Sequence, residues 1–191
     1  PARYKAYEQK LKQWESSGKR SRMPVKPEGP GTRTQPASLY NGMLHPALPY
    51  NIAGILWYQA EANSPRYHSY GELIRGMIRL WRADFKQGDL PFYYVELANN
   101  KRGTDKTGYQ WAYTREMQRE ALKEPNTAYV TAIDIGESAN AHFRNKQELG
   151  RRLALCALNQ YYKKDIEYLG PQYAGAQFNG DKARVTFTHA D

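Results

Sequence analysis

Polar residues that could carry out chemistry come directly after two apolar runs of the sequence. The run "GILWYQAEAN" ends in Gln59, Glu61 and Asn63, and "PFYYVELANN" ends in Asn99 and Asn100. Amide groups placed at one edge of a site can donate hydrogen bonds to negative charge that develops during acyl transfer. The sequence contains neither a GxGxxG nor a Walker loop, so a nucleotide cofactor is not predicted.

A third apolar run, "TAYVTAIDI", contains Asp134 next to its end and is followed by Glu137, Asn140 and His142. We predict that His142 is a general base, because it follows a strand and precedes a helix that would hold it at the edge of the sheet. Three other histidines are interpreted as surface or packing residues: His45, His68 and His189.

A histidine base needs a nucleophile, and the sequence does not supply an obvious one. None of the seven serines lies in a tight turn of the GxSxG kind; Ser138, the nearest to His142, is interpreted as a loop residue. No metal site is predicted, because no two histidines have i, i+4 spacing and Cys156 is the single cysteine. Cys156 lies in an apolar helical segment and is expected to be a core residue.

Alternating strands and helices should position these groups. Strands are predicted over 52–58, 91–98 and 127–135, and helices over 70–85, 111–122 and 145–162. The first strand is nearly continuous in apolar residues, so burial on both faces is predicted. This order is typical of an α/β fold with a parallel sheet covered by helices. Ligands bind beyond the carboxyl ends of such strands, where the polar residues should meet.

The two ends of the chain differ from this pattern. Tyr4, Tyr7, Leu11 and Trp14 are spaced as one face of an amphipathic helix, and a connection rich in Gly and Pro follows. Near the other end, Asn179 and Gly180 indicate a hairpin turn. We therefore predict a helix with its connection over 1–37, the main domain over 38–169, and the start of a truncated β element over 170–191.

The net charge of +9 is concentrated near the beginning of the chain. Residues 1–35 hold nine basic and three acidic side chains, so they account for +6 of the total. No zinc-ligand spacing, helix-turn-helix pattern or RNP-like strand accompanies them, so we interpret them as a solvated basic segment and predict no nucleic-acid partner. The sequence has no apolar run of about 18 residues and no signal peptide.

Four blocks of the sequence together resemble the sialate O-acetylesterase family, a branch of the SGNH hydrolases. They are "SLYNGMLHPALPYNIAGILWYQAEAN", "LIRGMIRLWRADF", "LPFYYVELAN" and "IDIGESANAHFRNKQELGRRLALCAL", and the resemblance extends over about 38–170. It implies a flavodoxin-like three-layer α/β/α fold and a Ser-His esterase that removes acetyl groups from O-acetylated sugars. A secreted or periplasmic protein is also implied.

The resemblance assigns roles to particular residues. His142 matches the catalytic histidine of a "DIHPxNKQEVGRRLA"-like block, while Gln59 and Glu61 match a "WYQGES" block whose Gln amide is expected near the oxyanion. We predict that Asn63 and Asn99 contribute to the same substrate-binding edge. The family's nucleophilic serine lies in a "GQSNM"-like block upstream of the matched region. The chain is therefore expected to be an internal part of a larger enzyme, inactive alone, with the missing part as its partner.

The chain also departs from the family pattern at four positions. Ala60 and Ala62 replace the Gly and Ser of "QGES", Asn140 replaces an Asp, and Phe143 replaces a Pro. Asn140 is kept as a predicted substrate-binding residue, and Asp134 becomes a possible partner that orients the imidazole. A glycan-binding or scaffold module with a decayed site remains the alternative function.

Overall fold

The computed structural model describes residues 2–27, 35–100 and 109–190. They form two compact units, residues 1–50 and 51–191, which are described separately. These divisions do not coincide with the domain boundaries predicted from the sequence, and those boundaries stay a prediction. None of the described helices is long and apolar enough to cross a membrane.

The first unit is built on the helix α1 (Ala2–Ser16). Tyr4, Tyr7, Leu11 and Trp14 are its half-buried residues, which confirms the amphipathic face predicted from their spacing. The segment after the helix turns back along this face, because the Tyr4 hydroxyl donates to the Pro27 carbonyl at 3.3 Å and Trp14 Nε1 donates to a carbonyl seven residues later. The short turns η1 (Tyr40–Leu44) and η2 (His45–Ala47) complete the unit.

The second unit contains a three-stranded parallel sheet with the order β1-β2-β3. Its strands are β1 (Ile55–Trp57), β2 (Phe92–Glu96) and β3 (Thr127–Thr131). The intervening elements are η3 (Glu61–Ser69), α2 (Tyr70–Phe85), α3 (Tyr109–Gln118) and η4 (Arg119–Lys123), and α4 (Lys146–Gln160) follows β3. The predicted α/β fold with parallel strands is confirmed.

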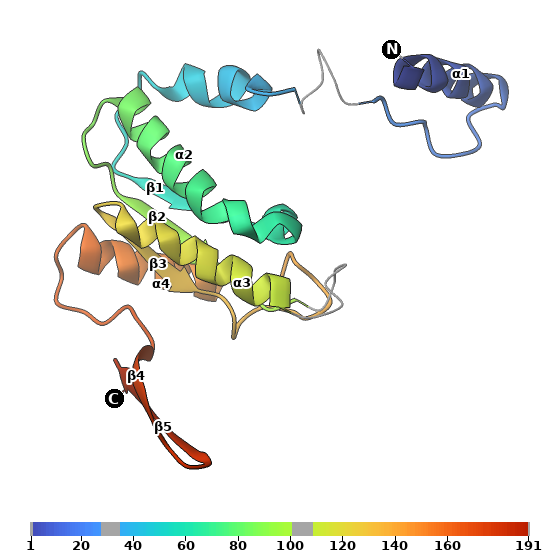
Figure 1. Cartoon of the computed structure of the whole chain (residues 1–191). Helices are drawn as coiled ribbons and strands as arrows, with labels where there is room; N and C mark the ends of the chain where they lie inside the picture. Colours follow the sequence, from blue (N-terminus) through green and yellow to red (C-terminus); the bar gives the residue numbers. More distant parts are fainter. Residues whose placement is uncertain (1, 28–34, 101–108, 191) are drawn as a thin grey trace. The chain divides into compact units, whose positions relative to one another are not determined.

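Helices cover both faces of this sheet (Figure 1). On one face, Ile74 and Ile78 of α2 pack in a cluster with Phe92 and Tyr94 of β2. On the other face, a second cluster joins α4 to the alternate strand residues: Leu149 and Cys156 from the helix, with Tyr93, Val95 and Val130 from the strands. Successive side chains of a strand point to opposite faces, so β2 supplies both clusters and is buried throughout. Cys156 is a core residue, as predicted.

One prediction about β1 is wrong. This strand is shorter than predicted, and Leu56 at its centre is 60% exposed. The reason is the position of α4, which contacts β3 and β2 but leaves the same face of β1 uncovered among the described residues. The continuous apolar run predicted burial on both faces of β1, but the described helices bury only one of them.

The end of the described chain is an antiparallel hairpin. The strands β4 (Gln172–Asn179) and β5 (Lys182–Thr188) pair with each other and not with the parallel sheet. Gly180 has a φ of 60°, a conformation that glycine adopts readily, and this confirms the turn predicted from the Asn-Gly pair.

Candidate active site

The loops that follow β1 and β3 meet at the carboxyl edge of the sheet. Tyr58, directly before Gln59, and Phe143, directly after His142, have ring centroids 6.1 Å apart. The ammonium group of Lys146 lies over both rings, 3.5 Å from the Phe143 centroid and 4.7 Å from the Tyr58 centroid. These contacts hold together the two loops that carry the predicted amide and imidazole groups.

Gln59 is held by hydrogen bonds at both ends of its amide group. Its Nε2 donates to Asn63 Oδ1 at 2.7 Å, and its Oε1 accepts from the Tyr70 hydroxyl at 3.2 Å. An amide nitrogen carries two hydrogens, so the bond to Asn63 leaves the second one for another acceptor. The amide is therefore oriented by its neighbours and retains a donor.

Gln118 positions this loop from beneath, and the sequence analysis missed it. Its buried side chain accepts from Leu97 N at 2.9 Å and donates to Val95 O at 3.0 Å. The same Nε2 lies 3.4 Å from Gln59 O, which also accepts from the Tyr70 hydroxyl. One amide thus bridges the ends of β1 and β2. A glutamine on the buried face of a helix was the available signal, because a buried polar side chain needs partners.

Glu61 shapes the loop that follows Gln59. Its Oε2 accepts from Ala60 N at 3.0 Å, and Asn63 N donates to Ala60 O at 2.8 Å. Ala60 is buried and has φ 157° and ψ −8°, a conformation that residues with a Cβ rarely adopt. The glycine expected here from the family resemblance would adopt it more easily.

A tight turn over 137–144 presents His142. Asn140 holds the backbone of His142 on both sides: its Oδ1 accepts from His142 N at 2.9 Å, and its Nδ2 donates to His142 O at 2.9 Å. Glu137 Oε1 accepts from Arg144 N at 2.9 Å and closes the turn. The His142 side chain is exposed and its imidazole has no hydrogen-bond partner within the part of the chain described here. The ring is thus accessible to a substrate or to another group.

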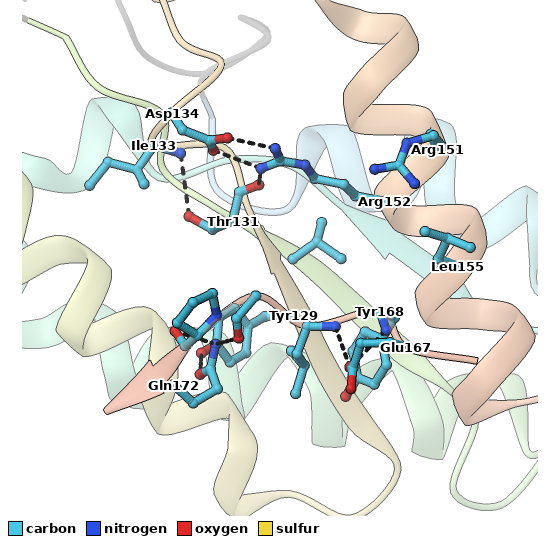
Figure 2. Close-up of a pocket in the computed structure, with 14 residues that line it drawn as sticks. Tyr129, Thr131, Ile133, Asp134, Arg151, Arg152, Leu155, Glu167, Tyr168 and Gln172 are labelled. Carbon is cyan, nitrogen blue, oxygen red and sulfur yellow. Dashed lines mark hydrogen bonds and ion pairs between the residues drawn. The ribbon is translucent and has the colours of Figure 1, made fainter. Parts of the chain in front are cut away.

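Asp134 is bound by an arginine (Figure 2). Arg152 donates from Nη1 to Asp134 Oδ1 at 2.7 Å and from Nη2 to Oδ2 at 2.6 Å, a bidentate pair. The Arg152 guanidinium lowers the pKa of Asp134 below its ordinary value. These contacts give Asp134 a different partner from the one predicted, and its role as the orienting partner of His142 stays a prediction.

The pocket drawn in Figure 2 is lined by the end of β3 but includes neither His142 nor Gln59. It has a volume of about 440 Å³ and lies between β3, α4 and the segment before β4. Asp134 lines it, together with Arg152, Tyr168 and Gln172, but the other predicted site residues do not.

Asn99 belongs to the loop after β2 and touches the loop after β3. Its side-chain oxygen lies against Gly136, where an added Cβ would stand 2.9 Å from Asn99 N and 2.8 Å from the Ala98 Cβ. The absence of a side chain at Gly136 thus allows the two loops to approach. Asn99 and Asn140 are both placed at the carboxyl edge of the sheet, as the parallel topology requires.

At this edge of the sheet, a lysine from α4 interacts with carboxylates of the two loops. Burial lowers the pKa of Lys146, while the carboxylates of Glu61 and Glu137 act in the opposite direction. Burial, followed by the charge of Glu61, raises the pKa of Tyr58 to about 12. Lys146 therefore lies near carboxylates from both loops. Within the described residues, no group of three or more His, Cys, Asp or Glu side chains could hold a metal ion.

Comparisons with known proteins agree on one family. A family model described as "Carbohydrate esterase, sialic acid-specific acetylesterase" matches residues 9–159. Sialate O-acetylesterase of Homo sapiens is 30% identical over 171 residues, which cover 79% of this chain and 32% of that protein. The Mus musculus protein of the same name is 28% identical over 156 residues, or 72% of this chain and 29% of that protein.

A solved structure gives the same result. The crystal structure of a carbohydrate acetylesterase from Xanthomonas citri superposes with a TM-score of 0.72 and 41% sequence identity, covering 78% of this chain and 35% of that chain. The likeness supports the three-layer fold. The chain spans about a third of the length of the relatives that it matches.

Proposed function

The chain belongs to the sialic acid-specific acetylesterase family of carbohydrate esterases, and we propose that it supplies the histidine and amide side of a serine esterase acting on O-acetylated sugars. The observation that carries the proposal is the contact between Tyr58 and Phe143, which brings the loops of Gln59 and His142 to one edge. An oriented amide with a spare donor and an accessible imidazole are two of the groups that ester hydrolysis needs.

In the proposed mechanism, His142 accepts the proton of a serine hydroxyl as the serine oxygen attacks the acetyl carbonyl carbon. The carbonyl π electrons move to oxygen, and the second hydrogen of Gln59 Nε2, with backbone N–H groups, stabilises that oxyanion. When the tetrahedral intermediate collapses, the C–O bond to the sugar breaks and the imidazolium returns its proton to the sugar oxygen. Water, deprotonated by the same imidazole, then attacks the carbonyl carbon of the acetyl-serine. The C–O bond to the serine breaks, the imidazolium returns its proton to the serine oxygen, and acetate is released.

The remaining parts of the mechanism come from the family resemblance. We expect the nucleophilic serine to lie outside these 191 residues, in the upstream block typical of the family, so the chain alone should be inactive. Glu61 and Asn63 would maintain the loop around Gln59, and Asn99 and Asn140 would lie beside the substrate. Asp134 would influence the orientation of the His142 imidazole indirectly, through the loop that connects the two residues. A secreted or periplasmic location is expected from the family resemblance.

A second function, a glycan-binding module without catalysis, is favoured by a specific observation. Ala60 occupies a backbone conformation that suits glycine, and the side chain at position 62 has no hydroxyl. These features would distort an oxyanion site without removing an affinity for sugars.

Acetate release tests the proposal. The assay compares an O-acetylated sialoside and an acetylated xylan, each incubated with the 191-residue chain and with the longest natural protein that contains it. We expect release by the longer protein, reduced about 10²- to 10⁴-fold in its His142→Ala variant. His45→Ala is the matched control, since it removes an imidazole from the other compact unit, and it should leave the rate unchanged.

Other outcomes would change the proposal in defined ways. Release by the 191-residue chain, lost in His142→Ala, would place the nucleophile inside this sequence. Equal rates for wild type and His142→Ala would refute the role of His142. Binding of acetylated sugar without any acetate release would favour the glycan-binding module.

A further inference from the structure

An exposed aromatic cluster lies between η3 and α3. The rings of Tyr67 and Tyr113 are stacked, with centroids 5.1 Å apart and planes 11° from parallel. His68 packs on Tyr67 with a centroid distance of 3.8 Å. Tyr113 is 51% exposed and Tyr109, one helical turn earlier, is 66% exposed. We call Tyr67, His68 and Tyr113 the aromatic surface.

The aromatic surface is continuous with the candidate active site. Tyr67 belongs to η3, which begins at Glu61 and contains Asn63, the partner of the Gln59 amide. Tyr67 lies four residues after Asn63, just beyond a kink at Arg66, whose backbone angles (φ −128°, ψ 35°) are not helical. On the α3 side, Trp111 Nε1 donates to Ala98 O at 2.6 Å and fixes the start of the helix at the end of β2.

The exposure of these rings is not explained by the packing of the core. Tyr70, which follows η3, is buried and bonded to Gln59, whereas Tyr113 presents a large part of its ring to solvent. One face of Tyr113 is stacked on Tyr67, so a ligand ring would stack on the opposite face. Stacking also holds the ring in one orientation, which lowers the entropy cost of binding a ligand there.

Sugar rings fit such a surface. One face of a pyranose presents C–H groups and its rim presents hydroxyls, while a tyrosine combines an apolar ring face carrying partial negative charge with a polar tip. The neighbouring site is the one proposed to take an acetylated sugar. A ring at the aromatic surface would then belong to another sugar of the same substrate.

We propose that the aromatic surface binds a second sugar unit by stacking on Tyr113, so that the substrate is an acetylated glycan of two or more sugars rather than an acetylated monosaccharide. This inference rests on the proposed esterase function for its position relative to the reacting ester. Binding to the surface itself does not depend on catalysis. The two can therefore be tested separately.

The test uses matched pairs of substrates and the longest natural protein that contains this chain. One pair is O-acetylated sialic acid and O-acetylated sialyllactose; the other is acetylated methyl xyloside and acetylated xylotetraose. Tyr113→Ala should lower kcat/KM for the preferred oligosaccharide by about two- to tenfold, the range of an aromatic contact, and leave the single-sugar ester unchanged. Tyr113→Phe, which keeps the ring, should retain the wild-type value.

Tyr162→Ala is the matched control. Tyr162 is 60% exposed and also contacts an aromatic neighbour, Tyr161, but it follows the far end of α4. Its removal should change neither substrate. Thermal unfolding of each variant checks that the fold is retained.

The outcomes distinguish the two proposals. In Tyr113→Ala, kcat/KM could fall equally for the single-sugar and oligosaccharide esters, or for neither. Either result would overturn the stacking inference. Hydrolysis by the wild type would still support the esterase function. If the wild type hydrolyses none of the four esters, the affinity for the same oligosaccharides is measured by calorimetric titration. This measurement tests the aromatic surface independently of catalysis. An affinity that falls in Tyr113→Ala but not in Tyr113→Phe would support sugar binding at the aromatic surface and not the esterase function. An affinity that Tyr113→Ala leaves unchanged, or the absence of binding, would refute sugar binding at this surface.

Discussion

Replacing Gly136 with alanine should destabilise the protein by forcing two loops of the candidate site apart. The new Cβ would stand 2.8 Å from the Ala98 Cβ and 2.9 Å from Asn99 N. Carbon atoms in contact prefer separations of about 3.5–4.0 Å, so one loop must move by about 1 Å. The displaced segment leads into the turn that presents His142.

The magnitude follows from the cost of overpacking. Extra carbon atoms in a closely packed place cost about 1–3 kcal/mol. For a protein of this size each kcal/mol lowers Tm by about 2–4 °C, so Gly136→Ala should lower Tm by about 2–12 °C. Thermal unfolding followed by circular dichroism measures this shift, and the urea midpoint should fall with it.

Gly150→Ala is the matched control. Gly150 lies inside α4 with nothing within 4 Å of an added Cβ. Alanine in a helix is favoured over glycine by about 0.5–1 kcal/mol, so this variant should be more stable than wild type. Adding Ala98→Gly to Gly136→Ala removes the overlap of the two Cβ atoms and should restore part of the loss. An unchanged or higher Tm for Gly136→Ala would refute the close approach of the loops.

Three further predictions concern the same unit. Asn140→Asp should lower the urea-unfolding free energy by about 1 kcal/mol, because the side chain loses its donor to the His142 carbonyl; an unchanged value would contradict the two-sided bond. Arg152 lowers the pKa of Asp134, so this contribution to stability is complete at neutral pH and is lost as the pH falls below about 4, through the folded pKa. The urea midpoints of wild type and Arg152→Met should therefore be closer at pH 3 than at pH 7, and a constant gap would refute the linkage. Burial raises the pKa of Cys156 to about 12, so a thiol reagent should label it only after unfolding, and rapid labelling of the native protein would contradict its burial.

The fold could be predicted where local patterns and packing agree. The helix over 70–85 was predicted with its observed bounds, because apolar residues recur on one face and the chain turns left-handed at Lys86. The strand β2 is central and buried on both faces, as its continuous apolar run indicates. The edge strand β1 has a similar composition but a different environment. The sequence of β1 does not show that α4 covers β3 and β2 but leaves the corresponding face of β1 exposed at Leu56.

The site could be predicted only in part, since topology fixes where loops meet but not which atoms bond. Parallel strands place Gln59, Asn99 and His142 at one edge of the sheet. The pairing of Asp134 with Arg152 depends on the rotation of α4 above β3, which brings together residues 18 positions apart. Gln118 likewise acts through its position under the strand ends.

Asn140 shows why a departure from a family pattern need not mean a lost function. An aspartate at this position could accept from His142 N but could not donate to His142 O, and its charge would face the nearby Glu137 carboxylate. The amide satisfies both backbone groups of His142 and so fixes the turn that presents the imidazole. Asn140 therefore makes two hydrogen bonds to the His142 backbone, where an aspartate could make only one. Acetate release by the longer protein that is lost in its His142→Ala variant would support the esterase, whereas sugar binding without acetate release would support the glycan-binding module.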